Sequence, residues 1–242
     1  MSDTLLRVAG VSKHFGGFTA LDQVSIDIRR GERFGLIGPN GSGKTTLINC
    51  ISGALWNDAG AIQFEGREIS RLPAYQRTRL GIARSFQIPR PFSSMSVLEN
   101  LVVPLEYVVH RSSLHTADTR GEALEILRRI GLADKAGTRA NRLTQVELRK
   151  LELARAMAAR PRLLISDEAM AGLSPSEVDE VLAILRRLSE TGITIIMIEH
   201  IMHAVMRFSQ RVMCLDAGRT ICEGTPADVQ ANPEVQRAYL GT

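Results

Sequence analysis

The sequence predicts an α/β fold in which a parallel sheet forms the core, antiparallel strands flank it, and an α-helical segment interrupts it. Short apolar runs, typical of buried parallel strands, recur on both sides of the middle of the chain. The first part of the chain alternates apolar and polar residues, as strands with one exposed face do. Between about residues 96 and 160, helical patterns dominate instead. This order is typical of a parallel-sheet domain that carries a helical insertion.

The front of the chain combines alternating strands with a strand–loop–helix unit. FGLIG, residues 34–38, is a short apolar run before a glycine-rich loop, as expected of a buried parallel strand. KTTLINCIS, residues 44–52, follows as a helix, and Gly53 is a suitable C-cap. Strands are expected at residues 5–15, 21–30, 34–38 and 61–66.

The middle of the chain is helical and its last third returns to α/β order. Ser96 and Glu99 form a capping box before LENLVV. GEALEILRRIGL has the apolar spacing of an amphipathic helix, with Gly131 as its stop. Ser174 and Pro175 are the expected N-cap and first residue of a later helix. The elements expected in the last third of the chain are a strand at 162–166, a helix at 175–192, a strand at 193–198, a helix at 201–209 and a hairpin at 211–224.

We expect a single domain that spans residues 1–242. Its expected parts are residues 1–87, with the antiparallel strands and the first part of the core, a helical subdomain at 88–156, and the rest of the core with C-terminal helices at 157–242.

The bulk properties exclude some classes of function. A net charge of +4 is mild and does not demand a nucleic acid partner, so none is expected. The strongly apolar run ITIIMI is far too short to cross a bilayer. If the protein works at a membrane, another subunit must span it.

The stretch GPNGSGKTT fits the phosphate-loop pattern G-x-x-x-x-G-K-[ST] and lies between an expected strand and an expected helix, as that motif requires. Its glycines let several backbone N–H groups point at phosphate oxygens, and the helix N-terminus adds partial positive charge. Lys44 is expected to reach the β- and γ-phosphates of ATP, and the Thr45 hydroxyl to bind Mg²⁺. The core is therefore predicted to be a P-loop NTPase. The expected nucleotide-binding residues of the loop are Gly38, Pro39, Asn40, Gly41, Ser42, Gly43, Lys44, Thr45 and Thr46.

Two acids, Asp167 and Glu168, end the apolar run LLIS at the carboxyl end of an expected parallel strand. Ligands of open α/β sheets bind at that edge. Adjacent residues at a strand end point in different directions, so the two carboxylates can do different work. Asp167 is expected to hold Mg²⁺ through its water shell, and Glu168 to accept a proton from the attacking water or to orient it. Alone, such a pair often begins a solvated loop, but the phosphate loop upstream favours the catalytic interpretation.

Together these motifs resemble the nucleotide-binding subunit of ABC transporters over nearly the whole chain. The resemblance implies that Phe15 of KHFGG stacks on adenine, with core packing as the alternative. It also implies that Gln87 of ARSFQIP senses Mg²⁺ and the attacking water, and that His200 of MIEH contacts the γ-phosphate. The expected catalytic residues are Glu168, His200, Gln87 and Lys44, and the expected metal-binding residues are Thr45, Gln87 and Asp167.

The family signature LSGGQ, which faces the nucleotide of the other ATPase subunit, is altered here to LTQVE. Thr144 and Glu147 still predict a capping box, so a helix N-terminus facing phosphate is expected. Gln145 and Val146 prevent the close backbone approach that glycine permits, and Glu147 brings negative charge toward a polyphosphate. We therefore expect a second, different ATPase subunit with an intact signature. A homodimer stays the alternative, because a helix N-terminus binds phosphate through backbone N–H groups alone.

Several stretches resemble, more narrowly, the larger ATPase subunit of branched-chain (hydrophobic) amino acid uptake systems. They are FGGFTALDQVS, GIARSFQIPRPF, SVLENLVV and the tail GTPADVQANPEVQRAYLG. The resemblance implies an ATP-hydrolysing subunit of a bacterial importer for such amino acids or for a related small amide or organic acid. It would be peripheral, on the cytoplasmic face of the inner membrane. The implied partners are two membrane permease subunits and an extracytoplasmic substrate-binding protein that acts through them.

The segment between Gln87 and Leu101 is expected to receive a short helix of the membrane subunit on Phe92, Met95 and Val97, or else to belong to the core of its lobe. Two other functions stay open. One is an ATPase of a lipopolysaccharide exporter or another ABC system. The other is a nucleotide-binding scaffold that hydrolyses little because of its altered signature. A soluble DNA-repair or ribosome-associated ATPase is disfavoured, because the chain has neither a long coiled-coil insertion nor a tandem copy.

Overall fold

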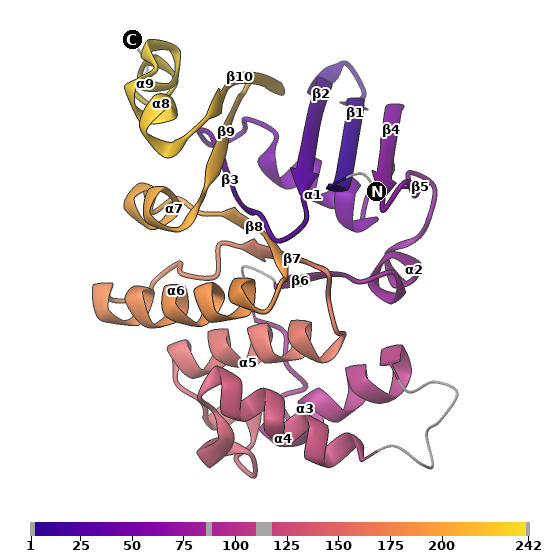
Figure 1. Cartoon of the computed structure of the whole chain (residues 1–242), viewed down its shortest axis with the longest axis vertical. Coiled ribbons are helices and arrows are strands. Elements are labelled where there is room, and N and C mark those ends of the chain that lie inside the picture. The colour runs from indigo at the N-terminus through magenta and orange to yellow at the C-terminus, as the bar shows by residue number, and fades with distance from the viewer. Residues whose placement is uncertain (1–2, 86–88, 110–117, 241–242) are drawn as a thin grey trace.

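A computed structural model of the 242-residue chain describes residues 3–85, 89–109 and 118–240. Their strands form a four-stranded antiparallel sheet and a six-stranded, mainly parallel sheet, with helices around them (Figure 1). The predicted α/β class, with a parallel core flanked by antiparallel strands, is confirmed.

The antiparallel sheet is built on a long hairpin. Its strands, in spatial order, are β2 (Phe18–Arg29), β1 (Thr4–Phe15), β4 (Ala59–Phe64) and β5 (Arg67–Glu68). Leu6, Val8 and Ile62 are buried, so one face of this sheet packs on the core. The strand β2 begins earlier than the expected residue 21, because Gly16, at a φ of 59°, lets the chain reverse in a tight turn.

The six-stranded sheet forms the centre of the core. Its strands, in spatial order, are β10 (Arg219–Gly224), β9 (Arg211–Asp216), β3 (Arg33–Ile37), β8 (Thr194–Ile198), β7 (Leu163–Asp167) and β6 (Ile82–Ser85). The strands from β9 to β6 pair in parallel, whereas β10 is antiparallel to β9. Their register places Ile198 beside both Leu36 and Asp167. The segments that follow β3, β7 and β8 therefore meet at one edge of the sheet.

Helices cover the two faces of this sheet. They are α1 (Lys44–Ser52), α2 (Ala74–Arg79), α6 (Pro175–Glu190), α7 (Met202–Phe208) and, in the C-terminal tail, α8 (Pro226–Ala231) and α9 (Pro233–Leu240). Side chains of β8 alternate between the faces: Ile196 packs with α1 and the antiparallel sheet, whereas Met197 packs with α6 and α7. Helix α1 spans the predicted residues and ends at Gly53, and α6 begins at its predicted N-cap Ser174.

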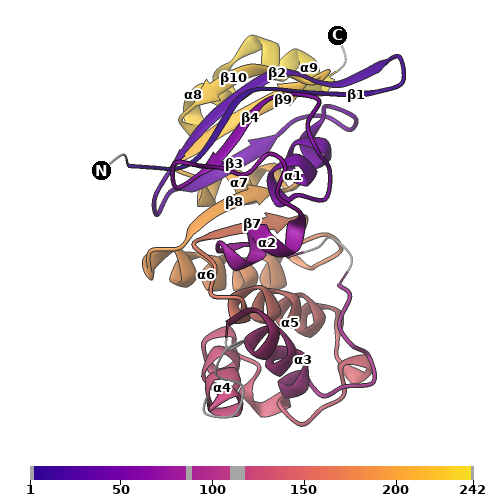
Figure 2. The same ribbon diagram turned by 90° about the vertical axis from the view of Figure 1, so that its right-hand side faces the viewer.

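A group of helices forms the predicted helical insertion. It consists of α3 (Val97–Pro104) with a π-helical turn (Leu105–Val109), α4 (Thr119–Ile130), α5 (Gln145–Ala158) and 3-10 turns at Ala133–Lys135 and Ala140–Arg142. In both views α3, α4 and α5 lie at one end of the molecule and α8 and α9 at the other (Figures 1 and 2). The capping box of Ser96 and Glu99 and the stop at Gly131 are confirmed. Helix α4 begins before the expected residue 121, because the side chain of Asp118 caps it.

The expected boundaries of the helical subdomain are only partly covered by the structure. The boundary at residues 87 and 88 lies outside the described residues, and the one after residue 156 falls inside α5, so the division into parts stays a prediction. In the expected docking segment, Phe92 is exposed but Val97 is fully buried. Val97 follows the N-cap Ser96 and packs in the lobe core, so for this residue the alternative of core packing holds and not the docking surface.

Candidate functional site

The phosphate loop joins β3 to α1 through positions that only glycine can fill. A Cβ atom at Gly38 would lie 2.2 Å from the carbonyl oxygen of Leu215. Gly43 has a φ of 103°, and a Cβ there would lie 2.6 Å from the carbonyl oxygen of Ala20. Gly43 is also the N-cap of α1, where no side chain accepts a hydrogen bond from the first turn. The helix N-terminus therefore presents its N–H groups and its partial positive charge to a ligand.

Lys44 is folded back onto this loop. Its ammonium group is buried and donates hydrogen bonds to the carbonyl oxygens of Gly38, at 2.7 Å, and Pro39, at 2.9 Å. Burial lowers the pKa of Lys44, and the charge of Glu168 acts in the opposite direction. The cation is thus held at the loop, where a phosphate oxygen can replace the carbonyl groups as its partner.

The two acids at the end of β7 point in different directions, as predicted. Asp167 accepts a hydrogen bond from the guanidinium group of Arg84, with 2.5 Å between Nη2 and Oδ2. Arg84 also donates to the side chain of Asn49 on α1, at 2.7 Å. Glu168 has a φ of 48°, and its carboxylate lies 2.6 Å from Nε2 of His200. One acid therefore faces α1 and β6, and the other faces the end of β8.

One pocket, of about 260 Å³, brings most of the predicted residues together. Phe15 lines it and is 48% exposed, so it is not part of the core. Phe18, which the sequence analysis missed, lines the same pocket, because the tight turn pairs it with Phe15 and places both rings on one face. Gln87 lies outside the described residues. The remaining lining residues are Ala20, Asn40, Gly41, Ser42, Gly43, Lys44, Thr45, Thr46, Glu168 and His200.

The altered signature opens α5 with the predicted capping box. The backbone N–H of Thr144 donates to the carboxylate of Glu147 at 2.8 Å, and Lys135 lies 3.2 Å from that carboxylate. These hydrogen bonds, led by the one from Thr144, lower the pKa of Glu147. The amide of Gln145 donates to the carbonyl oxygen of Ala171 at 3.4 Å. The signature residues Thr144, Gln145, Val146 and Glu147 do not line this pocket, and their role toward another subunit stays a prediction.

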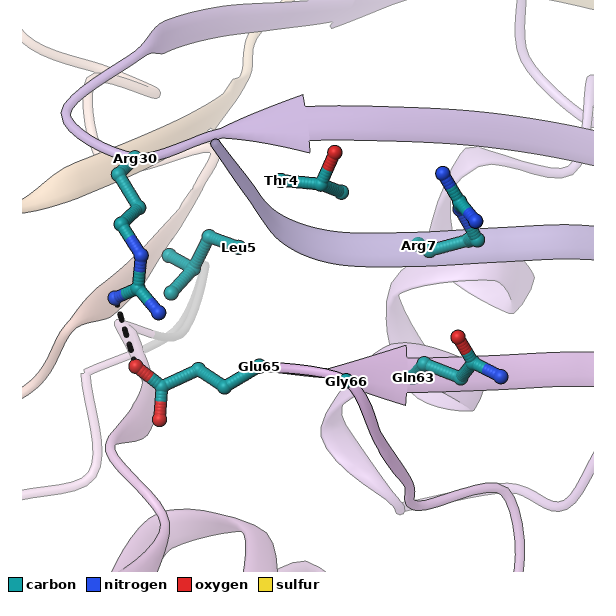
Figure 3. A pocket seen from close by; sticks show the side chains of 7 residues that line it. All are labelled: Thr4, Leu5, Arg7, Arg30, Gln63, Glu65 and Gly66. Atoms are coloured by element: carbon teal, nitrogen blue, oxygen red, sulfur yellow. Dashed lines mark hydrogen bonds and ion pairs between the residues drawn. The ribbon is translucent and has the colours of Figure 1, made fainter. Parts of the chain in front are cut away.

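A second pocket, of about 480 Å³, lies at the opposite end of β1 (Figure 3). Its arginines already have acidic partners: Arg30 is 2.7 Å from Glu65, and Arg7 is 2.8 Å from Asp27. Because these charges are paired, the pocket offers no anion site comparable with the phosphate loop. The pocket between the phosphate loop and Phe15 is therefore the better candidate for a nucleotide site.

Residues 21–171, which contain the phosphate loop and the acid pair, match the family model described as ABC transporter. The chain belongs to the ABC transporter family. The resemblance seen in the sequence is thus confirmed, and the chain is an ABC ATPase that binds ATP. Residues 219–242 match a further model, described as a branched-chain amino acid ATP-binding cassette transporter.

Relatives that match over their full length are named as ATP-binding proteins of branched-chain amino acid transport. It is 41% identical over 255 residues to the high-affinity branched-chain amino acid transport ATP-binding protein LivG of Salmonella typhimurium, covering 100% of this chain and 99% of that protein. It is 36% identical over 253 residues to the corresponding protein BraF of Pseudomonas aeruginosa, again covering 100% and 99%.

Solved structures of ABC cassettes share the fold. A nucleotide-free ATP-binding cassette from an ABC transporter superposes with a TM-score of 0.89 at 31% identity, covering 99% of this chain and all of that one. The dimeric structure of a bacterial ABC transporter cassette superposes with a TM-score of 0.83 at 25% identity, covering 92% of this chain and 99% of that one. In the described part of this ABC ATPase, no helix is both long and apolar enough to cross a membrane.

Proposed function

We propose that this ABC ATPase energises the uptake of branched-chain amino acids, or of a related small amide or organic acid, through a bacterial inner-membrane importer. The main support for ATP hydrolysis is that the phosphate loop, Glu168, His200 and Phe15 line one pocket at the carboxyl edge of the core sheet. The cargo class is supported by the match of the C-terminal tail and by the names of the full-length relatives.

The geometry of the pocket supports a direct mechanism for hydrolysis. The ring of Phe15 stacks on adenine, and the backbone amides of residues 40–46 hold the phosphates. Lys44 exchanges its carbonyl partners for the β- and γ-phosphates. Glu168 orients the attacking water and takes its proton, while His200, in contact with Glu168, stabilises the γ-phosphate. Water attacks in line, and the bond from the γ-phosphate to ADP breaks.

The residues present fit a Mg²⁺ ion. Thr45 lines the phosphate pocket and Asp167 ends β7, and their hydroxyl and carboxylate groups offer the oxygen atoms that Mg²⁺ prefers. Among the described residues there is no cluster of three or more His, Cys, Asp and Glu side chains that could hold a metal by itself. This fits an ion that binds together with the nucleotide, held by Thr45, Asp167 and phosphate oxygens, with Gln87 as a further expected ligand. When bound, it neutralises charge on the phosphates.

The altered signature supports a heterodimer with a second ATPase subunit, although a homodimer is the alternative. The pocket holds most of the described residues that a subunit is expected to supply to its own nucleotide, although Gly38, Pro39 and Asp167 do not line it. The helix that would face the partner's nucleotide begins with Gln145 and Val146 where the family has glycines, and Glu147 adds a carboxylate there. The same alteration favours the scaffold alternative, in which the chain binds ATP but hydrolyses little.

A third hollow, a groove on the helical side of the molecule, supports docking on a membrane permease subunit. It has a volume of about 370 Å³ and lies between β6, α3 and α5. Tyr107 and Phe92 line it and are 68% and 43% exposed, and the guanidinium of Arg155 lies over the ring of Phe92. Exposed aromatic and arginine side chains around a groove are typical of protein interfaces. A short amphipathic helix of a permease, supplied at the cytoplasmic face of the membrane, fits this groove.

Uptake measured in the source bacterium tests the proposal. Cells that lack this chain should lose most high-affinity uptake of radiolabelled leucine, isoleucine and valine. The wild-type chain should restore uptake, whereas Lys44→Ala, which cannot hold the phosphates, should not. Unchanged uptake of all three amino acids, or a defect in lipopolysaccharide export instead, would overturn the assignment of the cargo.

A further inference from the structure

The C-terminal tail reaches the phosphate loop. Helix α8 packs on β9 and β10, and α9 packs on β10 and α8, at the sheet edge formed by β10, which β9 separates from β3. From α9, the hydroxyl of Tyr239 accepts a hydrogen bond from the backbone N–H of Gly38, at 2.7 Å. The Tyr239 side chain is 42% exposed, but desolvation of its hydroxyl raises the pKa of Tyr239 to about 12, so the hydroxyl is neutral at physiological pH. A residue near the end of the chain is therefore bonded to the first residue of the phosphate loop.

Gly38 links this tail to the nucleotide side of the loop. Its N–H is bonded to Tyr239, and its carbonyl oxygen accepts a hydrogen bond from the ammonium group of Lys44 at 2.7 Å. Its Cα has no free space, because a Cβ there would lie 2.2 Å from Leu215 on β9 and 2.5 Å from the Ser42 hydroxyl. Gly38 does not itself line the nucleotide pocket, so its N–H is available to the tail without loss of a phosphate contact.

We propose that Tyr239 is a positioning residue that fixes the start of the phosphate loop in the shape that binds ATP. By holding the N–H of Gly38, Tyr239 also fixes the position of the Gly38 carbonyl group. Lys44 donates to that carbonyl oxygen before it turns to the phosphates. The C-terminal tail, which the chain shares with branched-chain amino acid cassettes, thereby acts on nucleotide affinity. This inference rests on ATP binding at the loop and is independent of which cargo is transported.

The test compares Tyr239→Phe with the wild type and with Tyr75→Phe. Tyr75 lies on α2, far from the phosphate loop in sequence, and its hydroxyl accepts a local hydrogen bond from the side chain of Gln76. ATP affinity is measured by calorimetry on the full chain. The loss of one hydrogen bond should raise the Kd for Mg·ATP about 2- to 10-fold in Tyr239→Phe and leave Tyr75→Phe unchanged. In ¹⁵N-labelled protein, the Gly38 amide resonance should shift in Tyr239→Phe only.

The outcomes are decisive in both directions. A shifted Gly38 amide with an unchanged Kd would show that the bond exists but does not position the loop, and would overturn the proposal. An amide that does not shift would also overturn it. If Tyr239→Phe does not fold, hydrogen exchange of the wild-type protein decides: the Gly38 amide should be protected, and rapid exchange there would refute the bond. None of these results depends on amino acid uptake, so a wrong cargo would be recognised separately.

Discussion

Nε2 of His200 lies 2.6 Å from Oε1 of Glu168, and this contact joins the ends of β8 and β7 at the nucleotide pocket. Glu168 reaches it only because its backbone adopts a φ of 48°, a left-handed conformation that is unfavourable for a residue with a side chain. The backbone N–H of Glu168 donates to the carbonyl oxygen of Ile198 at 2.8 Å, which holds it there. The strain turns this carboxylate away from Asp167 and toward the phosphate end of the pocket.

Replacement of Glu168 by Gln should lower kcat by about two to four powers of ten, because a positioned base contributes that much. The side chain keeps its shape, so the Kd for ATP should stay within a few-fold of the wild-type value. Turnover and ATP binding are measured on the same preparation. Glu190→Gln, at an exposed position at the end of α6, is the matched control and should retain full activity. Hydrolysis by Glu168→Gln at the wild-type rate would exclude Glu168 as the base.

Replacement of Arg84 by Met should lower the free energy of unfolding by about 3 kcal/mol. The side chains of Arg84 and Asp167 are only 10% and 9% exposed, and loss of one partner leaves the other charge buried. Urea unfolding measures the change. The control is Arg128→Met, whose pair with Glu125 is exposed and should contribute less than about 1 kcal/mol. Equal losses in the two variants would mean that the buried pair does not stabilise the protein.

Stability should depend on pH through Glu199, which is 3% exposed and accepts a hydrogen bond from the backbone N–H of Met170. Burial, with a smaller contribution from Glu168, raises the pKa of Glu199 from 4.5 to about 7. The folded state therefore binds this proton more tightly than the unfolded state. The associated stability is fully present below about pH 4.5 and is lost as the pH rises through about 7.

The comparison with Glu199→Gln isolates this dependence. Between pH 5 and pH 8 the wild type should lose stability relative to the variant, by up to about 3 kcal/mol. Urea unfolding at both pH values gives the difference. If the two proteins show parallel pH profiles, Glu199 is ionised in the folded state across this range.

Local patterns made much of the core predictable. The end of α1 at Gly53 and the start of α6 at Ser174 were predicted because caps and turns of three or four residues determine them. The sequence also predicted that the phosphate loop, Asp167 and His200 lie close together, because each follows or ends a parallel strand and parallel strands end at the same edge of a sheet.

Contacts that depend on register across the sheets were not predictable. Arg84 meets Asp167 only because β6 lies beside β7, and the sequence around Ile82–Ser85 carried no pattern that marked it as a strand. Phe18 was missed because its role depends on the exact turn between β1 and β2. The hydrogen bond from the Gly38 N–H to the Tyr239 hydroxyl joins residues 201 positions apart, and no spacing rule connects them.

Replacement of Phe15 by Ala should raise the Kd for ATP about 5- to 100-fold, the range expected when one base loses its stacking partner. Fluorescence titration with ATP and with GTP should show similar losses, since stacking tolerates any base. Phe18→Ala tests whether the second aromatic ring that lines this pocket also contributes to ATP affinity. Tyr75→Ala removes an exposed aromatic side chain elsewhere and should have no effect. An unchanged Kd in Phe15→Ala would place the adenine away from this hairpin.

Restoring the two glycines of the family signature should change both the turnover and the stability of this ATPase. If Gln145 and Val146 weaken the contact with a partner's nucleotide, the double variant Gln145→Gly, Val146→Gly should raise the turnover of the purified homodimer by at least about tenfold, which corresponds to about 1.4 kcal/mol of transition-state free energy. The same change should lower the free energy of unfolding by about 1–2 kcal/mol, because two glycines enter the first turn of α5. The hydrogen bond from Gln145 to Ala171 is also lost.

Opposite effects on turnover and on stability separate this explanation from a general improvement of the fold. The double variant in a Lys44→Ala background is the control, and its turnover should stay at the background level, because the gain requires ATP in the phosphate loop. A wild-type homodimer that already hydrolyses ATP at the full rate, and that gains nothing from the two glycines, would show that Thr144 and the backbone N–H groups of α5 suffice. The need for a different partner subunit would then disappear.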